Sequence, residues 1–150
     1  MANGTDQERV GGPGDEAGQT RILIVDDEEM IRVLLTEVLS QEGYDVVTAK
    51  DGQEALSILE RGGIDLVLTD MVMPRGSGLE VLEAARRYDP SVPVIVMTGY
   101  PSIDDAADLV RMGVSDYISK PFDLEVIREL VRKHLGERRR QRERGDADPA

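Results

Sequence analysis

The sequence predicts an α/β fold in which five parallel strands alternate with five helices. Short runs of apolar and β-branched residues, bounded by turn residues, are typical of strands buried on both faces of a parallel sheet. Between these runs the apolar residues recur at helical spacing, and this alternation indicates βαβ units with helices on both faces of the sheet. The expected strands are Arg21–Val25, Tyr44–Thr48, Asp65–Thr69, Val92–Met97 and Asp116–Ser119.

The first helix is predicted from its apolar periodicity. Apolar residues recur at positions i, i+3, i+4, i+7 and i+8, and Gly43 ends the pattern. Met30 and Val33 lie off this stripe and are expected to face solvent. The stripe consists of Ile31, Leu34, Leu35, Val38 and Leu39.

The other four helices are bounded by glycine, proline and capping residues. Ser102 and Asp105 resemble a capping box at the start of the fourth helix, and Asp123 is suited to cap the fifth. His134, the only histidine, lies late in the fifth helix and is expected to be solvated. These helices are expected at about residues 52–61, 78–88, 102–112 and 123–135.

Right-handed crossovers between five strands favour one topology. It is the flavodoxin-like, doubly wound three-layer sandwich with the parallel sheet order 2-1-3-4-5, in which the second strand lies at an edge. The order reverses between strands 1 and 3, so their carboxyl ends become neighbours. Because ligands of open α/β sheets bind at such a reversal, the residues that follow these two strands are candidates for function.

Composition excludes several classes of protein. The chain has 150 residues, of which 40% are hydrophobic, and is expected to form one folded domain. Its formal charge of −12 argues against a nucleic-acid surface, because phosphate contacts dominate such binding. The absence of cysteine excludes disulfides and thiolate metal sites. No apolar run approaches a membrane span and no signal-peptide pattern is present, so we expect a cytoplasmic protein with no membrane partner.

The chain is expected to divide into three segments. Residues 1–20 are rich in Gly, Asp, Glu and Gln, lack periodicity, and predict a disordered leader. Residues 21–135 form the domain. Residues 136–150 form an arginine-rich charged tail that is either an extension of the last helix or disordered. The chain is therefore a stand-alone domain or a fragment of a longer protein, and the lack of a hydrophobic linker at its end favours the first.

Three acids converge on the predicted crevice. Asp26 and Asp27 follow the first strand and Asp70 follows the third, while Thr98 and Lys120 arrive at the ends of the fourth and fifth. Close carboxylates repel one another unless positive charge lies among them. A lysine offsets one charge, and Mg²⁺, which prefers oxygen ligands, can offset the rest. This arrangement suits phosphoryl transfer, with Asp70 as the nucleophile.

Each of these residues has a simpler explanation when it is taken alone. Asp27 could cap the first helix, Thr98 could cap a loop, and Lys120 could be a solvated lysine before a turn. Asp70 could be an acid that makes a turn at the end of a strand. Four independent coincidences at the carboxyl ends of strands are harder to obtain than one site, so the joint placement favours the site.

The same residues resemble the receiver domain of two-component response regulators. The likeness covers about residues 21 to 135, and its markers occur in the family's order. Among subfamilies, the segments 98–101 and 116–122 are most similar to receivers of the nitrogen-regulatory type. The markers are Asp26–Asp27, Asp70 followed by Met73–Pro74, Thr98–Gly99 and Lys120–Pro121–Phe122.

The resemblance implies a role for each residue of the acidic site. Asp70 matches the acceptor that takes a phosphoryl group from a phosphohistidine on a sensor histidine kinase or a histidine phosphotransfer protein. Asp27, Asp70 and the backbone carbonyl of Val72 match the Mg²⁺ ligands, and Asp26 matches the acid that holds the ion through water. Lys120 matches the lysine that binds a phosphoryl oxygen.

The resemblance also implies a switch and a partner surface. Thr98 and Tyr117 match the residues that change position on phosphorylation, which would alter the face made by helix 4, strand 5 and helix 5. That face is also where a homodimer would form, and the downstream protein target is unknown. Val72 and Tyr100 match the positions that tune hydrolysis. Because neither side chain helps to place a water molecule, we expect self-dephosphorylation in minutes or longer.

Two other functions remain open from the sequence. One is a small metal-dependent phosphohydrolase that uses the same acids, although no further general acid or base and no substrate pocket is encoded. The other is a pseudo-receiver scaffold that binds partners without phosphorylation, which the complete set of acids with Thr98 and Lys120 disfavours. We expect no enzymatic activity beyond the chain's own phosphorylation and slow dephosphorylation.

Overall fold

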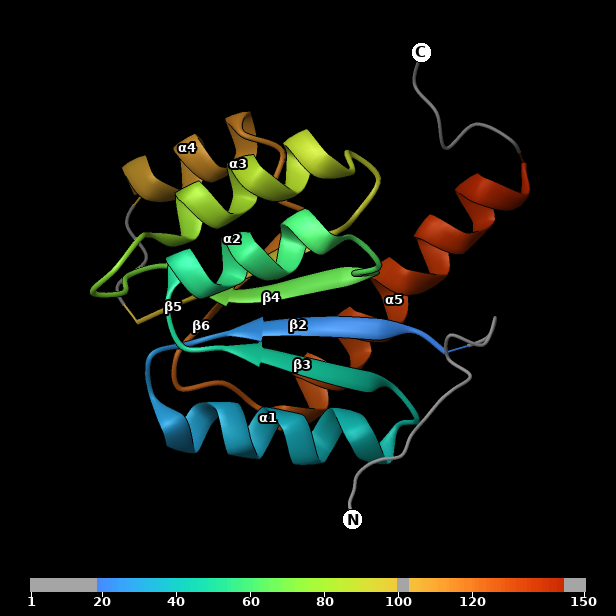
Figure 1. Cartoon of the computed structure of the whole chain (residues 1–150), viewed down its shortest axis with the longest axis horizontal. Helices are drawn as coiled ribbons and strands as arrows, with labels where there is room; N and C mark the ends of the chain where they lie inside the picture. Colours follow the sequence, from blue (N-terminus) through green and yellow to red (C-terminus); the bar gives the residue numbers. More distant parts are fainter. Residues whose placement is uncertain (1–18, 100–102, 145–150) are drawn as a thin grey trace.

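The computed structural model describes residues 19–99 and 103–144 (Figure 1). Within these residues five strands alternate with five helices, as predicted. The strands are β2 (Arg21–Val25), β3 (Asp45–Ala49), β4 (Leu66–Asp70), β5 (Val94–Thr98) and β6 (Asp116–Ser119). The helices are α1 (Glu29–Gln41), α2 (Gly52–Arg61), α3 (Gly78–Tyr88), α4 (Ile103–Arg111) and α5 (Leu124–Glu143).

The strands form one parallel sheet in the order β3-β2-β4-β5-β6. The predicted order 2-1-3-4-5 is confirmed, with β3 at an edge. Val25 of β2 lies opposite Thr69 of β4, and Asp70 lies opposite Met97 of β5. This register places the ends of β2 and β4 side by side at the carboxyl edge of the sheet.

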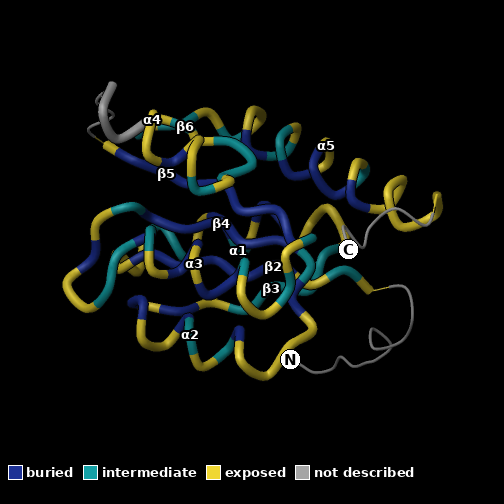
Figure 2. The backbone as a smooth tube through the Cα atoms, turned by 90° about the horizontal axis from the view of Figure 1, so that it is seen from above, coloured by how far each residue is buried: buried dark blue, intermediate teal, exposed yellow. Residues whose placement is uncertain are grey.

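Helices cover both faces of the sheet (Figure 1). Because successive strand residues point to opposite faces, Ile22 and Ile24 of β2 pack with α1 and α5, whereas Leu23 and Val25 pack with α2, α3 and α4. Strands β4 and β5 are buried along their whole length, while the edge strands β3 and β6 are partly exposed (Figure 2). The burial of both faces explains why the inner strands are continuous apolar runs.

Capping residues fix several helix ends where the sequence predicts them. The Asp123 carboxylate accepts a hydrogen bond from the backbone N–H of Glu125 at 2.8 Å at the start of α5. At the start of α2, the Asp51 carboxylate accepts one from the N–H of Glu54 at 2.9 Å. Ser102 lies outside the described residues, so the cap predicted for α4 stays a prediction.

Helix α1 buries a narrower stripe than its periodicity predicts. Met30 and Val33 are 83% and 58% exposed, in agreement with the expectation that they face solvent. Leu34, a member of the predicted apolar stripe, is 39% exposed and lines a groove with Pro121 and Phe122. The buried residues of α1 are Leu35, Val38 and Leu39.

Helix α5 extends to Glu143 and packs against the sheet beyond its predicted end. His134 is buried, and its Nε2 lies 3.1 Å from Oδ2 of Asp116 at the start of β6. The expectation that His134 is solvated is therefore wrong, because a carboxylate of the neighbouring strand lies within hydrogen-bond reach. Arg138, one turn further on, is also buried. Neither α5 nor any other helix among the described residues is long and apolar enough to cross a membrane.

Candidate functional site

The three predicted acids meet at the carboxyl edge of the sheet. Oxygen atoms of Asp26, Asp27 and Asp70 all lie within 4.8 Å of one another. Asp26 is fully buried and Asp70 is 7% exposed, whereas Asp27 is open to solvent. The cluster forms because β2 and β4 are neighbours in the sheet and each is followed, or ended, by an acid. The cluster therefore offers only carboxylate oxygen atoms as possible ligands, and it is open to solvent on the side of Asp27.

Lys120 supplies the positive charge that the carboxylates need. Its Nζ lies 3.0 Å from Oδ2 of Asp26 and 3.4 Å from Oδ1 of Asp70. The residue directly follows β6, and its backbone N–H donates a hydrogen bond to the carbonyl of Thr98 at 2.8 Å. This backbone bond ties the lysine to the end of β5, so the ammonium is held over the acids by the sheet itself.

The carboxylate of Asp70 is held in an unfavourable environment. Burial and the nearby charge of Asp26 raise its pKa to about 6, although Lys120 and a hydrogen bond from the backbone N–H of Met71 to Oδ1 at 2.9 Å act in the opposite direction. Burial lowers the pKa of Lys120, but its hydrogen bond and attraction to Asp26, with its attraction to Asp70, outweigh that effect and raise it. The site therefore carries more negative charge than it compensates.

Asp26 is fixed from both sides of its carboxylate. Oδ1 accepts a hydrogen bond from the backbone N–H of Glu28 at 2.9 Å, while Oδ2 accepts the one from Lys120. Its backbone carbonyl accepts a hydrogen bond from Nη1 of Arg32 at 2.8 Å, which ties α1 to the end of β2. Both oxygens of Asp26 are thus occupied, and Asp27 is the most exposed acid of the cluster.

The remaining predicted site residues lie at different depths. Thr98 is buried at the end of β5, one residue beyond the partner of Asp70 in the neighbouring strand. Val72 is 74% exposed on the loop after β4, and Tyr117 is 39% exposed on β6. Tyr100 lies outside the described residues. The structure thus brings Thr98 to the edge of the acidic cluster and leaves Tyr117 partly outside the core.

Glu28 is a neighbour of the site that the sequence analysis did not single out. Its Oε1 lies 3.8 Å from Nζ of Lys120, and its backbone N–H orients Asp26. The run of four acids from Asp26 to Glu29 was the available signal. Because such a run also suits a helix start, its third member could not be distinguished from a helix-stabilising acid without the position of Lys120.

Comparisons with known proteins agree with this geometry. Sporulation initiation phosphotransferase F of Bacillus subtilis is 41% identical over 115 residues, which make up 77% of this chain and 93% of that protein. A CheY-like receiver domain protein from Methanospirillum hungatei has a similar crystal structure, with a TM-score of 0.80, 32% identity, and coverage of 83% of this chain and 99% of that one.

A third similar protein has a crystal structure that contains bound ligands. The response regulator TrrA of Thermotoga maritima, solved in complex with Mg²⁺ and BeF, has a TM-score of 0.69 and 40% identity, over 77% of this chain and 99% of that one. Other relatives are longer: the chain spans only 29% of PilR of Pseudomonas aeruginosa, to which it is 39% identical over 128 residues, or 85% of this chain.

The family itself is shown by a direct match. The model of the response regulator receiver domain matches residues 22–132, which include the acidic cluster and Lys120. The fold, the strand order and the convergence of the acids are those that the resemblance implies. The chain therefore belongs to the response regulator receiver domains of two-component signal transduction.

Proposed function

We propose that Asp70 is the residue of this receiver domain that accepts a phosphoryl group from a phosphohistidine. The donor would be a sensor histidine kinase or a histidine phosphotransfer protein. The observation that carries the proposal is the position of Lys120, whose Nζ lies 3.4 Å from Oδ1 of Asp70 while it is anchored to Asp26. A fixed ammonium at that place can bind an oxygen of the phosphoryl group as it reaches the carboxylate.

The transfer needs only positioning and charge from this chain. A carboxylate oxygen of Asp70 attacks phosphorus, the bond between phosphorus and the histidine nitrogen of the donor breaks, and the imidazole leaves with the electron pair. The product is an acyl phosphate on Asp70. Lys120 binds a phosphoryl oxygen, and the buried Asp26 keeps the lysine in place from the other side.

The acids fit a Mg²⁺ ion, because hard cations of this size take carboxylate and carbonyl oxygens and keep positions for water and phosphate. Asp27, Asp70 and the backbone carbonyl of Val72 would hold the ion, and Asp26 would contact it through water. When bound, it would neutralise charge on the carboxylates and on the phosphoryl oxygens. This assignment is supported by the positions of the three acids, since carboxylate oxygens of Asp26, Asp27 and Asp70 lie within 4.8 Å of one another.

Signalling would follow from movement of Thr98 and Tyr117 after phosphorylation of Asp70. Thr98 would donate a hydrogen bond to the phosphoryl group, and Tyr117 would turn toward the space that Thr98 leaves. The face made by α4, β6 and α5 would then change, with a downstream protein or a second copy of the chain as its partner. We also infer slow self-dephosphorylation, because Val72 is apolar and Tyr100 is a bulky aromatic, and such side chains give little help in placing a water molecule for attack.

The surface beside the site suits the donor protein. A groove runs from Lys120 along α1, and Met30 and Val33 lie exposed on the same helix. Apolar side chains there would contact a helix of the donor and bring its phosphohistidine to Asp70. We propose that this encounter takes place in the cytoplasm. The residues that line the groove are Glu28, Ile31, Leu34, Gly99, Lys120, Pro121 and Phe122.

Mass spectrometry after incubation with Mg²⁺ and acetyl phosphate tests the proposal. We expect the chain to gain the mass of one phosphoryl group and Asp70→Asn to gain none, because the amide cannot form an acyl phosphate. Labelling of Asp70→Asn would refute the assignment of the acceptor. Repeated turnover of a small phosphate ester would instead indicate a phosphohydrolase, and failure to bind Mg²⁺ would indicate a scaffold.

A further inference from the structure

The loop between β4 and α3, residues 71–77, is held by backbone hydrogen bonds at its neck and at its tip. At the neck, the N–H of Gly78 donates to the carbonyl of Met71 at 2.9 Å. At the tip, the N–H of Gly52 at the start of α2 donates to the carbonyl of Arg75 at 2.9 Å. These bonds therefore hold the segment that carries one proposed ligand, the carbonyl of Val72, and that directly follows another, Asp70.

A side chain at Gly78 would collide with the backbone of Asp70 and Met71. A Cβ added there would lie 2.6 Å from the carbonyl oxygen of Asp70 and 2.9 Å from Cα of Met71, closer than real Cβ contacts. Both neighbours are backbone atoms and cannot rotate away. An ordinary contact begins at 3.4 Å, so a methyl group would force the backbone of Asp70 and the start of α3 about 0.8 Å further apart.

Gly52 makes a similar but looser approach at the tip of the loop. Its added Cβ would lie 3.0 Å from the carbonyl oxygen of Arg75 and 3.0 Å from Cα of Gly76. These contacts are tight and again involve backbone. The tip lies further from Asp70 along the chain than the neck does. A displacement of the tip should therefore move Asp70 less than an equal displacement of the neck.

We infer that Gly78 and Gly52 are positioning residues for phosphorylation. By letting the first turns of α3 and α2 approach the loop, they set the place of the Asp70 carboxylate and the Val72 carbonyl relative to Asp27 and Lys120. The inference rests on the proposed function of Asp70. A displacement near 1 Å at a reacting group is enough to slow a reaction by orders of magnitude, and loss of support around a metal site weakens binding roughly tenfold or more.

Three glycine-to-alanine variants test the inference. Mg²⁺ binding is measured by calorimetry, phosphorylation by acetyl phosphate across Mg²⁺ concentrations by mass spectrometry, and stability by urea unfolding. We expect Gly78→Ala to bind Mg²⁺ about tenfold more weakly and to be phosphorylated at least tenfold more slowly, and Gly52→Ala to change each by about threefold. Gly136→Ala is the control, because its Cβ would make only an ordinary contact at 3.6 Å in α5.

Each outcome decides between positioning and a purely structural role. If Gly78→Ala loses stability but its folded form binds Mg²⁺ and is phosphorylated like the wild type, the inference is wrong. If Gly78→Ala does not fold, Gly52→Ala decides in the same way. Failure of the wild-type chain to be labelled at Asp70 would instead overturn the proposed function, independently of the glycines.

Discussion

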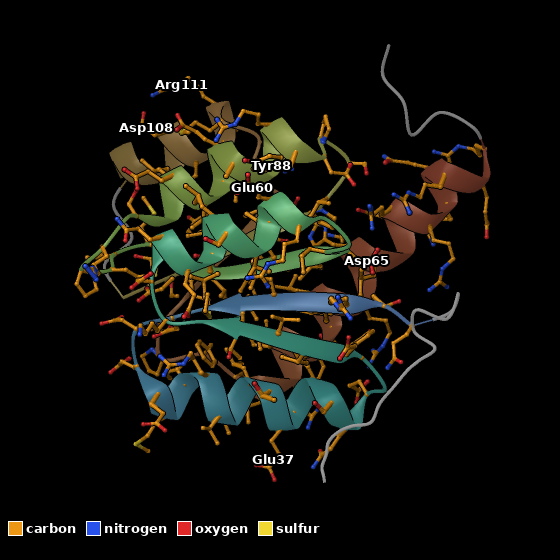
Figure 3. The ribbon with its side chains drawn as sticks, viewed as in Figure 1. Glu37, Glu60, Asp65, Tyr88, Asp108 and Arg111 are labelled. Carbon is orange, nitrogen blue, oxygen red and sulfur yellow. The ribbon has the colours of Figure 1, made fainter. Side chains whose placement is uncertain are left out.

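A cluster of acidic and basic side chains lies at each end of the sheet, and the two clusters differ in their balance of charge. At the carboxyl edge, a cluster of three carboxylates includes two, Asp26 and Asp70, that share the ammonium of Lys120. At the amino edge, Arg138 of α5 lies 2.7 Å from Oδ1 of Asp65 and 3.1 Å from Oδ2 of Asp89. Asp65 lies directly before β4, beside α5 (Figure 3). Both clusters are partly buried, yet the second has as much positive as negative charge, because Nη2 of Arg142 also lies 3.9 Å from Oδ2 of Asp89.

The pKa shifts express this difference. Burial and Asp26 raise the pKa of Asp70 to about 6. Burial alone would raise the pKa of Asp89 too, but hydrogen bonds from Ser91 and the charge of Arg138 outweigh it and lower the pKa. A matched cluster stabilises the fold, whereas an unmatched one costs stability and leaves a site that a cation or a phosphoryl group can complete.

The largest expected effect comes from removing the ammonium group that contacts the carboxylates of Asp26 and Asp70. Lys120→Met should slow phosphorylation by acetyl phosphate by about 10²–10³-fold, because a fixed charge aimed at the transferring group is lost. The methionine keeps most of the apolar stem, so the fold should be retained. Rates of labelling at saturating Mg²⁺ measure the effect. A change of less than threefold would mean that Lys120 only balances charge in the resting protein.

The corresponding change at the amino edge should affect stability and leave phosphorylation intact. Arg138→Met leaves Asp65 and Asp89 without their shared partner and should lower the free energy of unfolding by about 3 kcal/mol, as expected when one member of a buried ion pair is removed. Urea unfolding measures it.

An exposed arginine on the same helix is the matched control for Arg138. Arg140→Met should change the free energy of unfolding by less than about 0.5 kcal/mol. Equal effects of the two variants would show that Arg138 acts only through the general charge of α5. Slower phosphorylation of folded Arg138→Met would show that the two ends of the sheet are coupled.

The same contrast explains what could be predicted from the sequence. The carboxyl cluster was predictable because its acids directly follow buried apolar runs, and parallel strand order alone brings such ends together. The amino cluster was not, because Asp65 was expected only as the first residue of a strand, Asp89 resembles an ordinary turn residue, and Arg138 is one of several tail arginines. Only the packing of α5 on the sheet distinguishes Arg138, and the same packing buries His134.

The smallest expected effects concern the pH dependence of stability. The contribution of Asp70 to stability changes with pH in the opposite direction to that of Asp89. Because the pKa of Asp70 is raised from 3.8 to about 6, the folded metal-free protein holds its proton more tightly than the unfolded chain. Stability from this group is present below pH 4 and is lost as the pH rises toward 6. Asp70→Asn should therefore stabilise the metal-free protein at pH 7 by about 1 kcal/mol, and by little at pH 3.5.

Asp89 should behave in the reverse way. Its lowered pKa means that it contributes stability above the ordinary value of 3.8, which is lost as the pH falls below it. Asp89→Asn should thus destabilise the protein at pH 7 and have less effect in acid, as measured by thermal unfolding in a chelating buffer across pH. Added Mg²⁺ should reduce the advantage of Asp70→Asn, because the ion compensates only the wild-type site, and should leave the effect of Asp89→Asn unchanged. Destabilisation by both variants at pH 7 would contradict the proposed excess of negative charge at the carboxyl edge.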